Sequence, residues 1–223
     1  MQVAHVRSNL PLRQGSYRGL AATANVFARE CHMDDLARLI KMDPLKFRIK
    51  NLDDNRLIEV LQTAAQKFGW NASKTPGQGY GIAGGFEKGG YVGTCAEVKI
   101  NGGKEVRVVR ITQVFECGAI INPHHLENQV MGCIVQALDG ALFEAVEFVN
   151  GKIINSGLSA YRVPRFSDVP KIEIILIDRK DLPSAGAGEA GIIGIAPAIR
   201  NAIVDATGKA LNTLPMLPNG MLA

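Results

Sequence analysis

Aromatic residues are scarce in this chain of 223 residues, at 6% of the composition, and its positive charge is not clustered. The 25 lysines and arginines outnumber the 21 acidic residues only slightly, for a net charge of +4. A nucleic-acid-binding surface needs a concentrated basic patch, commonly interleaved with stacking aromatics. The composition therefore argues against a nucleic-acid partner.

Cysteine is also sparse, and the four cysteines stand far apart in the sequence. Cys31, Cys95, Cys117 and Cys133 form no C-x-x-C pair and no zinc-ligand spacing, so we expect small buried thiols. No apolar run approaches the ~20 residues that a membrane-spanning helix needs. The first residues lack the layout of a signal peptide, and the start reads as a segment of a longer protein.

The hydrophobic content of 47% is enough to build a sizeable core. Apolar spacing and turn residues predict the following elements: a helix from about 23, a short helix opened by Asp43-Pro44, a helix capped by Asp54 or Asn55 and closed by Gly69, strands over 80–86, 91–100 and 105–115, a long helix from Asn122-Pro123, a hairpin turning at Asn150-Gly151, a strand over 171–178, and a last helix closed by Gly208. Hairpins and long helices without regular βαβ alternation indicate an α+β fold. We expect a helical part over 1–70, a linker over 71–79 and an α+β part over 80–223.

The stretch from Leu182 to Gly208 runs from a glycine-rich turn into the last helix, and Glu189 is the carboxylate within that turn. Small apolar neighbours should desolvate this carboxylate and raise its pKa, which suits a general base or acid. A carboxylate before a helix also complements the helix dipole. Residue types alone leave both roles open.

The last helix has an apolar face made by Ile195, Ile199, Ala202, Ile203 and Ala206. Pro197 fits its first turn, where the missing N–H has no intrahelical partner in any case. We expect Arg200, Asn201 and Asp205 on the opposite, polar face.

Two further sets of polar residues are candidates for binding. Arg18, in a glycine-flanked loop, has the fork of donors that holds an oxyanion or a phosphate. Gln129 and Gln136 are seven residues apart on the long helix, where buried amides can read the edge of a heterocycle. A solvated arginine and surface glutamines are the alternatives.

Two weaker patterns complete the candidates. His124, His125 and Glu127 resemble a metal cluster, but neighbouring helical residues point about 100° apart, so we expect no metal site there. Gly77–Gly81 resembles a phosphate loop, but it precedes a strand, so no helix N-terminus would face the phosphate.

Five stretches of the chain form a recognisable set. They are the turn Ser-Ala-Gly-Ala-Gly-Glu over 184–189, the Ile-Ala-Pro-Ala-Ile-Arg-Asn run from 195, the Tyr-Arg-Gly-Leu stretch from 17, Gly-Phe-Glu-Lys-Gly-Gly-Tyr over 85–91, and Phe-Glu-Cys-Gly-Ala-Ile-Ile-Asn-Pro over 115–123. Taken together, these motifs resemble the molybdenum hydroxylases of the xanthine dehydrogenase/aldehyde oxidase superfamily. The resemblance is to the molybdopterin-binding large subunit of the isoquinoline 1-oxidoreductase type, and within it to the C-terminal part. It extends from about 7 to 215.

The resemblance implies a site and a reaction. Glu189, after the Gly188 of a Gly-x-Gly-Glu turn, corresponds to the family's catalytic base, which takes a proton as oxygen attacks an electron-poor carbon of an aldehyde or N-heterocycle. The resemblance also implies that Arg18, Gly19, Gln129 and Gly188 bind the cofactor. Leu20 stands where xanthine-type members carry an aromatic, so purine substrates are not implied. The family's Gly-Gln-Gly loop has no clear counterpart, because Gln78 lies in the linker.

The resemblance also implies cofactors and partners. These are molybdopterin with molybdenum, in its cytosine dinucleotide form, and [2Fe-2S] clusters on a small partner chain, because this chain has no iron–sulfur cysteine motif. The remaining part of the molybdopterin subunit would be a further partner, and the isolated chain is expected to be inactive. A catalytically silent structural module of the same fold is the alternative. The compartment stays open between cytoplasm and periplasm.

Overall fold

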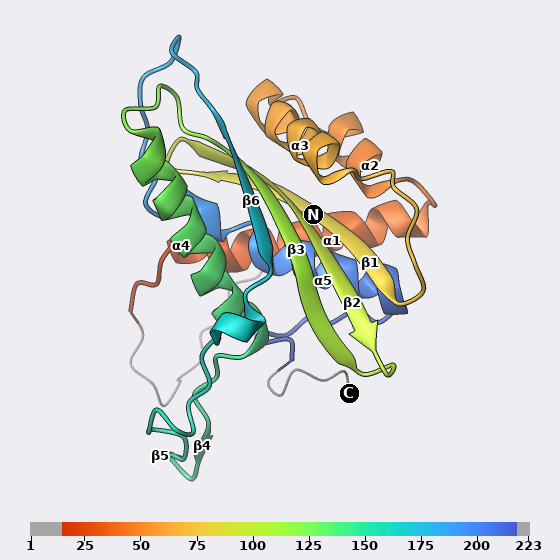
Figure 1. Cartoon of the computed structure of the whole chain (residues 1–223), viewed down its shortest axis with the longest axis vertical. Helices are drawn as coiled ribbons and strands as arrows, with labels where there is room; N and C mark the ends of the chain where they lie inside the picture. Colours follow the sequence, from red (N-terminus) through yellow and green to blue (C-terminus); the bar gives the residue numbers. More distant parts are fainter. Residues whose placement is uncertain (1–14, 218–223) are drawn as a thin grey trace.

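A computed structural model describes residues 15–217 as a four-stranded sheet with helices on both faces (Figure 1). The elements are α1 (Leu20–Leu39), α2 (Pro44–Lys50), α3 (Asn55–Phe68), β1 (Gln78–Glu87), β2 (Gly90–Asn101), β3 (Glu105–Glu116), α4 (Pro123–Leu142), β4 (Phe148–Val149), β5 (Lys152–Ile153), η1 (Phe166–Asp168), β6 (Lys171–Ile177), η2 (Ala190–Ile192) and α5 (Ile195–Thr207). The predicted α+β class is confirmed. The N-terminal residues that lack a signal-peptide pattern lie outside the described range.

Local chemistry sets the helix ends where the sequence predicts them. The Asp43 side chain accepts a 2.9 Å hydrogen bond from the Lys46 amide, and Asp54 caps α3. Gly69 and Gly208 close α3 and α5 in the left-handed conformation, with φ of 75° and 72°. The first helix starts earlier than expected, at Leu20.

The sheet has the strand order β1-β2-β3-β6, and its first three strands form an antiparallel meander. β6 pairs with β3 in parallel, after a crossover through α4. β1 begins at Gln78, which pairs with Lys99, so the strand is longer than the predicted 80–86. The small β4–β5 hairpin turns at Asn150-Gly151 as expected. The division into parts over 1–70, 71–79 and 80–223 stays a prediction.

Helices cover the two faces of the sheet unequally (Figure 1). α3 packs on one face, and α5 packs on the other, with α1 and α4 against it. Close packing explains the glycines of β1, since a Cβ on Gly81 would lie 2.0 Å from the Ala198 carbonyl oxygen. One on Gly79 would lie 2.1 Å from the Ala202 carbonyl oxygen. These glycines allow α5 to pack closely on β1, and they do not form a phosphate-binding loop.

The prediction of a polar face on α5 is wrong for two of its three residues. Arg200 and Asn201 are both 0% exposed. α5 lies between the sheet and α1, so no side of this part of the helix reaches solvent. Both side chains are paired: Arg200 makes a two-pronged ion pair with Asp35, at 2.6 and 2.9 Å, and the Asn201 amide donates to the Ile82 carbonyl at 3.1 Å.

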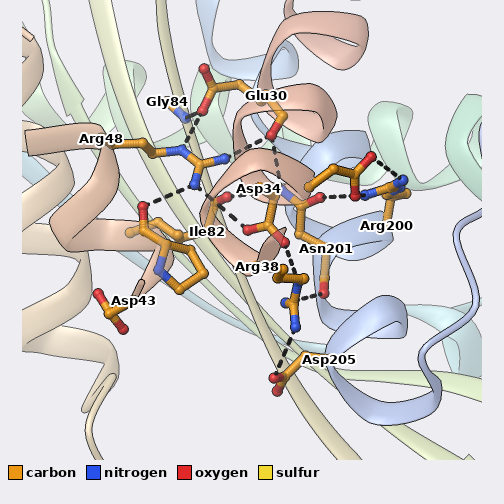
Figure 2. A network of polar contacts seen from close by, with 12 residues as sticks. Glu30, Asp34, Arg38, Asp43, Arg48, Ile82, Gly84, Arg200, Asn201 and Asp205 are labelled. Atoms are coloured by element: carbon orange, nitrogen blue, oxygen red, sulfur yellow. Dashed lines mark hydrogen bonds and ion pairs between the residues drawn. The ribbon is translucent and has the colours of Figure 1, made fainter. Parts of the chain in front are cut away.

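A buried ionic network joins α1 to α2 and α5 (Figure 2). Glu30 and Asp34 of α1 both face Arg48 of α2, at 2.8 and 3.6 Å. Arg38 pairs with Asp34 at 2.6 Å and reaches Asp205 of α5 at 3.6 Å. Charges this buried are tolerated only when paired. The network therefore fixes how α1 lies against α5, the two helices that follow the segments containing Arg18 and Glu189.

Between residues 15 and 217, none of the helices has the length and hydrophobicity needed to cross a bilayer.

Candidate functional site

Arg18 gathers three segments that are distant in the sequence. Its Nε donates to the Gly188 carbonyl at 2.7 Å, its Nη2 to Gln129 Oε1 at 2.8 Å, and its Nη1 to Gln136 Oε1 at 3.2 Å. A guanidinium can serve three acceptors at once because its donors form a rigid planar fork. The fold thus brings together four of the residues singled out in the sequence: Arg18, Gln129, Gln136 and Gly188. Arg18 is therefore not a freely solvated loop residue.

The backbone around Arg18 is held in a tight turn. The Leu20 amide donates to the Tyr17 carbonyl at 2.9 Å, and the Thr23 hydroxyl donates to the Arg18 carbonyl at 3.0 Å. Gly19 has φ of 83°, and a Cβ there would lie 2.7 Å from the Ile192 side chain. Only glycine satisfies both demands, so Gly19 shapes the loop that presents Arg18.

Glu189 lies at the same place, with its carboxylate beside the start of α1. Its Oε2 accepts a 3.3 Å hydrogen bond from the Gly19 amide and lies 3.1 Å from Lys88 Nζ. The Glu189 side chain is 34% exposed. The carboxylate is therefore neither isolated nor enclosed by apolar groups within the described part of the chain.

The expectation that the pKa of Glu189 is raised is wrong for this structure. The hydrogen bond and charge of Lys88 hold the pKa of that carboxyl below its ordinary value, and they outweigh the opposing effect of desolvation. The Gly19 amide and Arg18 act in the same direction. Glu189 is consequently ionised at neutral pH.

A capping role for Glu189 at the last helix is also not seen. α5 has Gly194 as its N-cap, and the Glu189 side chain makes no capping hydrogen bond to η2. The helix N-terminus that the carboxylate faces is that of α1, through the Gly19 amide. The Glu189 carboxylate therefore complements the dipole of α1, and not that of α5.

A mostly apolar pocket of about 290 Å³ adjoins the cluster. It lies between the end of β3, the first turns of α4 and the loop before Glu189, and its lining includes Cys117, Ile120, Leu126, Gln129, Ala187 and Gly188. Concave apolar surface with a few convergent polar groups is the usual setting of a ligand site. Arg18 adjoins the pocket because it donates to the carbonyl of Gly188, a lining residue. Glu189 adjoins it because it follows Gly188 in the chain.

Among the weaker candidates, His125 lines the pocket, and the others do not. His124 and His125 are exposed, with ring centroids 6.0 Å apart, and no group of His, Cys, Asp or Glu within 15–217 is arranged to hold a metal ion. The Gln78 side chain is bonded to Glu97 at 2.7 Å in the sheet. The four cysteines are buried free thiols, as expected. The sequence reasoning gave Lys88 no role, although this residue lies within the family motif over 85–91, in the turn between two strands.

Comparison with known families shows which family the chain belongs to. Residues 21–170 match the family described as the molybdopterin cofactor-binding domain. This chain is a member of that family. The match covers α1 to the segment before β6, and thus includes Gln129, while Arg18 and Glu189 lie outside it.

The relatives of this molybdopterin cofactor-binding domain include subunits of a dehydrogenase and of an oxidoreductase. It is 29% identical to a subunit of the nicotinate dehydrogenase of Pseudomonas putida, over 92% of this chain and 19% of that protein. It is 32% identical to the beta subunit of the isoquinoline 1-oxidoreductase of Brevundimonas diminuta, over 90% of this chain and 26% of that protein. The chain thus spans between about a fifth and a quarter of the length of these relatives.

A solved structure shows the same fold. The aldehyde oxidoreductase of Desulfovibrio gigas superposes with a TM-score of 0.74 at 18% identity, over 92% of this chain and 41% of that one. This superposition confirms the predicted fold. The predicted molybdopterin-binding family is confirmed by the match over residues 21–170.

The residues of the cluster suit an anionic, oxygen-rich cofactor such as molybdopterin. Arg18 supplies a cation, and the hydrogen bonds formed within 15–217 use only Oε1 of Gln129, which leaves its amide N–H groups as donors. Arginine and amide donors are the groups that recognise phosphate and carbonyl oxygens. The donor set therefore fits the cofactor that the family binds.

Proposed function

We propose that this chain forms one wall of a molybdenum cofactor site in an enzyme that hydroxylates an aldehyde or an N-heterocycle, with Glu189 as the general base. The observation that supports this proposal is the convergence of Arg18, Gly188 and Gln129 beside the Glu189 carboxylate. A cation, amide donors and a carboxylate at one spot provide both binding and proton transfer.

In this proposal Arg18, Gly19, Gln129 and Gly188 hold the cofactor, molybdopterin in its cytosine dinucleotide form. The cofactor supplies the redox chemistry at molybdenum, and the electrons leave through [2Fe-2S] clusters on a small partner chain. Arg18 orients the anionic groups through its planar fork, while Gln129 contributes its amide N–H. The rest of the molybdopterin subunit closes the site and excludes water.

Glu189 is in the state that a base requires. Because its pKa lies below the ordinary value, the carboxylate is ionised at neutral pH and ready to accept a proton. The low pKa makes it a weak proton acceptor while it remains solvated. Exclusion of water by the cofactor, the substrate and the rest of the subunit would raise its proton affinity during turnover.

The second candidate function is a catalytically silent structural module of the same family. The observation that favours it is the 3.1 Å ion pair between Lys88 and Glu189, which lowers the basicity of the carboxylate. In this alternative Glu189 would stabilise the junction between the Gly19 turn and the glycine turn without transferring a proton.

The decisive experiment assembles the complete enzyme, by producing this chain together with the rest of the subunit and the iron–sulfur partner. Glu189→Gln should lower turnover of an aldehyde or N-heterocycle by about 10²–10⁴-fold, the usual contribution of a general base. Its molybdenum content should equal that of the wild type. Glu127→Gln, an exposed residue of α4, is the matched control and should leave turnover unchanged.

Full activity in Glu189→Gln would refute the role as base. A complex that binds molybdenum but oxidises neither class of substrate would support the silent module instead.

A further inference from the structure

The turn between β1 and β2 packs directly against the segment that contains Glu189. Lys88 and Gly89 in this turn have φ of 50° and 82°. A Cβ on Gly89 would lie 2.9 Å from the Ala185 Cβ, and one on Gly90 would lie 3.1 Å from the Ala190 Cβ. The two glycines thus let the turn approach both sides of Glu189, and this approach brings the Lys88 side chain to the carboxylate.

The two oxygens of the Glu189 carboxylate have different surroundings. Lys88 Nζ, at 3.1 Å, and the Gly19 amide, at 3.3 Å, both contact Oε2. Among the hydrogen bonds formed between residues 15 and 217, none ends on Oε1, and the closest approach of the Lys88 ammonium is to Oε2. Partners that arrive from two different elements and meet at one oxygen fix the plane of the carboxylate and leave the other oxygen open.

Lys88 is the strongest of the charged groups that face Glu189. Arg18 at the start of α1 also acts on the carboxylate, but its three hydrogen bonds go to the Gly188 carbonyl and to the two glutamines of α4. From α4 itself, the thiol of Cys133 faces Glu189 and Arg18. Lys88 is the cation that makes direct contact, and half of its side chain remains exposed.

We propose that Lys88 is a positioning residue, which holds Oε2 of Glu189 so that Oε1 is the atom that accepts the proton. This inference rests on the proposed function of Glu189 as a base. Lys88 would serve two purposes: it fixes the direction of the carboxylate, and it keeps the carboxylate ionised over the working pH range. A lysine ammonium suits this task because it is a compact point charge on a flexible stem.

The first test measures Glu189 in the full chain, independently of any activity. Carbon-13 NMR of chain labelled at its glutamate carboxyls gives the titration of Glu189, with the signal assigned by its loss in Glu189→Gln. In Lys88→Met the midpoint of the Glu189 titration should move to higher pH, because the ammonium that favours the ionised form is gone. Lys88→Arg should keep the midpoint low.

Salt and a second lysine provide the controls for this titration. Raising the ionic strength should shift the wild-type midpoint upward, since the pair is partly exposed, and should affect Lys88→Met less. Lys104→Met, an exposed residue in the other turn of the meander, should leave the midpoint unchanged. An unchanged midpoint in Lys88→Met, or an equal change in Lys104→Met, would overturn the pairing.

The second test uses the assembled enzyme and its pH profile. In Lys88→Met the acidic limb of kcat/KM should move to higher pH, and kcat should fall at the optimum while KM changes little. Lys88→Arg should restore both. An unshifted limb would overturn the positioning role even if the NMR midpoint moves. If Glu189→Gln is fully active, the proposed base fails, and the titration still reports separately on the pairing of Lys88.

Discussion

Nη2 of Arg18 donates a 2.8 Å hydrogen bond to Oε1 of Gln129, across 111 positions of sequence. The same guanidinium reaches Gly188, 170 positions away. Neither contact follows from local structure, because each joins a loop at the start of α1 to a segment placed by the sheet and its helices. The site is therefore a product of the tertiary fold, and predictions about it must address both the contacts and the scaffold that holds them.

The fork of Arg18 is the first feature to test. In Arg18→Lys a single ammonium replaces the planar set of donors and cannot serve Gly188, Gln129 and the cofactor together. Each charge-assisted hydrogen bond that is lost costs about 1.5–3 kcal/mol. We expect the assembled enzyme to retain its cofactor roughly tenfold less well or worse, measured as molybdenum and pterin per protein after dialysis.

Arg179→Lys is the matched control for that loss, because Arg179 makes a comparable two-pronged pair with Asp181 on an exposed surface. Its cofactor content should equal that of the wild type. If the Arg18→Lys enzyme kept its full molybdenum and pterin content, Arg18 would hold segments of the protein together without binding the cofactor.

Gly81 tests the packing of α5 on the sheet. A Cβ at this position would lie 2.0 Å from the Ala198 carbonyl oxygen, a backbone atom that cannot move aside as the end of a flexible side chain could. We expect Gly81→Ala to destabilise the chain by about 3 kcal/mol or more, as severe overpacking does. Urea unfolding followed by circular dichroism gives the difference directly.

Gly140→Ala provides the opposite expectation. Gly140 lies within α4, and a Cβ there meets nothing within 4 Å. Alanine should therefore stabilise the helix by about 0.5–1 kcal/mol. If both substitutions destabilise equally, the close approach of α5 to β1 is not what sets the cost.

Arg48 tests the ionic network between α1 and α2. The Arg48 side chain is 2% exposed and faces Glu30 and Asp34, two buried carboxylates. Arg48→Met removes a cation and leaves charge without its partner, which costs about 3–5 kcal/mol. The double variant Glu30→Gln/Arg48→Met should recover part of this loss in the same unfolding measurement. A double variant that is no better than Arg48→Met would mean that packing, not charge, dominates.

Asp139 gives the chain a pH dependence at mildly acidic values. Burial, with the nearby Glu144 as a second cause, raises the pKa of Asp139 to about 6. The unfolded carboxyl loses its proton near its ordinary value of 3.8, so between these values the folded chain binds more protons. Stability from this group is present below about pH 4 and is lost as pH rises through about 6.

Asp139→Asn should remove that part of the pH dependence. Near pH 7 the variant should be more stable than the wild type by about 1 kcal/mol, after allowance for partial exposure. Unfolding midpoints across the acidic range measure the slope. Parallel curves for the two proteins would contradict the shifted pKa.

Much of the fold could be predicted because its signals are local. Asp43, Asp54 and Gly69 act within one turn of the backbone they cap, and the Asn150-Gly151 turn determines its own hairpin. Such residues place an element without reference to the rest of the molecule. The family motifs added the order of the pieces and the identity of the candidate site.

The failures have one physical cause, which is that neighbours came from elsewhere in the chain. Arg200 and Asn201 look like the polar face of an amphipathic helix, and only the position of α1 against α5 buries them. Glu189 has small apolar neighbours in sequence, but Lys88, in the turn between β1 and β2, lowers its pKa. Charge that arrives by tertiary packing leaves no periodic signal along the chain.

The packing of α5 against β1 also determines when this site can exist during synthesis. The Gly19 amide pairs with a carboxylate that emerges 170 residues later, and the sheet surface of β1 stays uncovered until α5 leaves the ribosome. Contacts this distant in sequence slow folding and leave apolar surface exposed in the meantime. The cluster around Arg18 therefore cannot form until the segment containing Glu189 has left the ribosome.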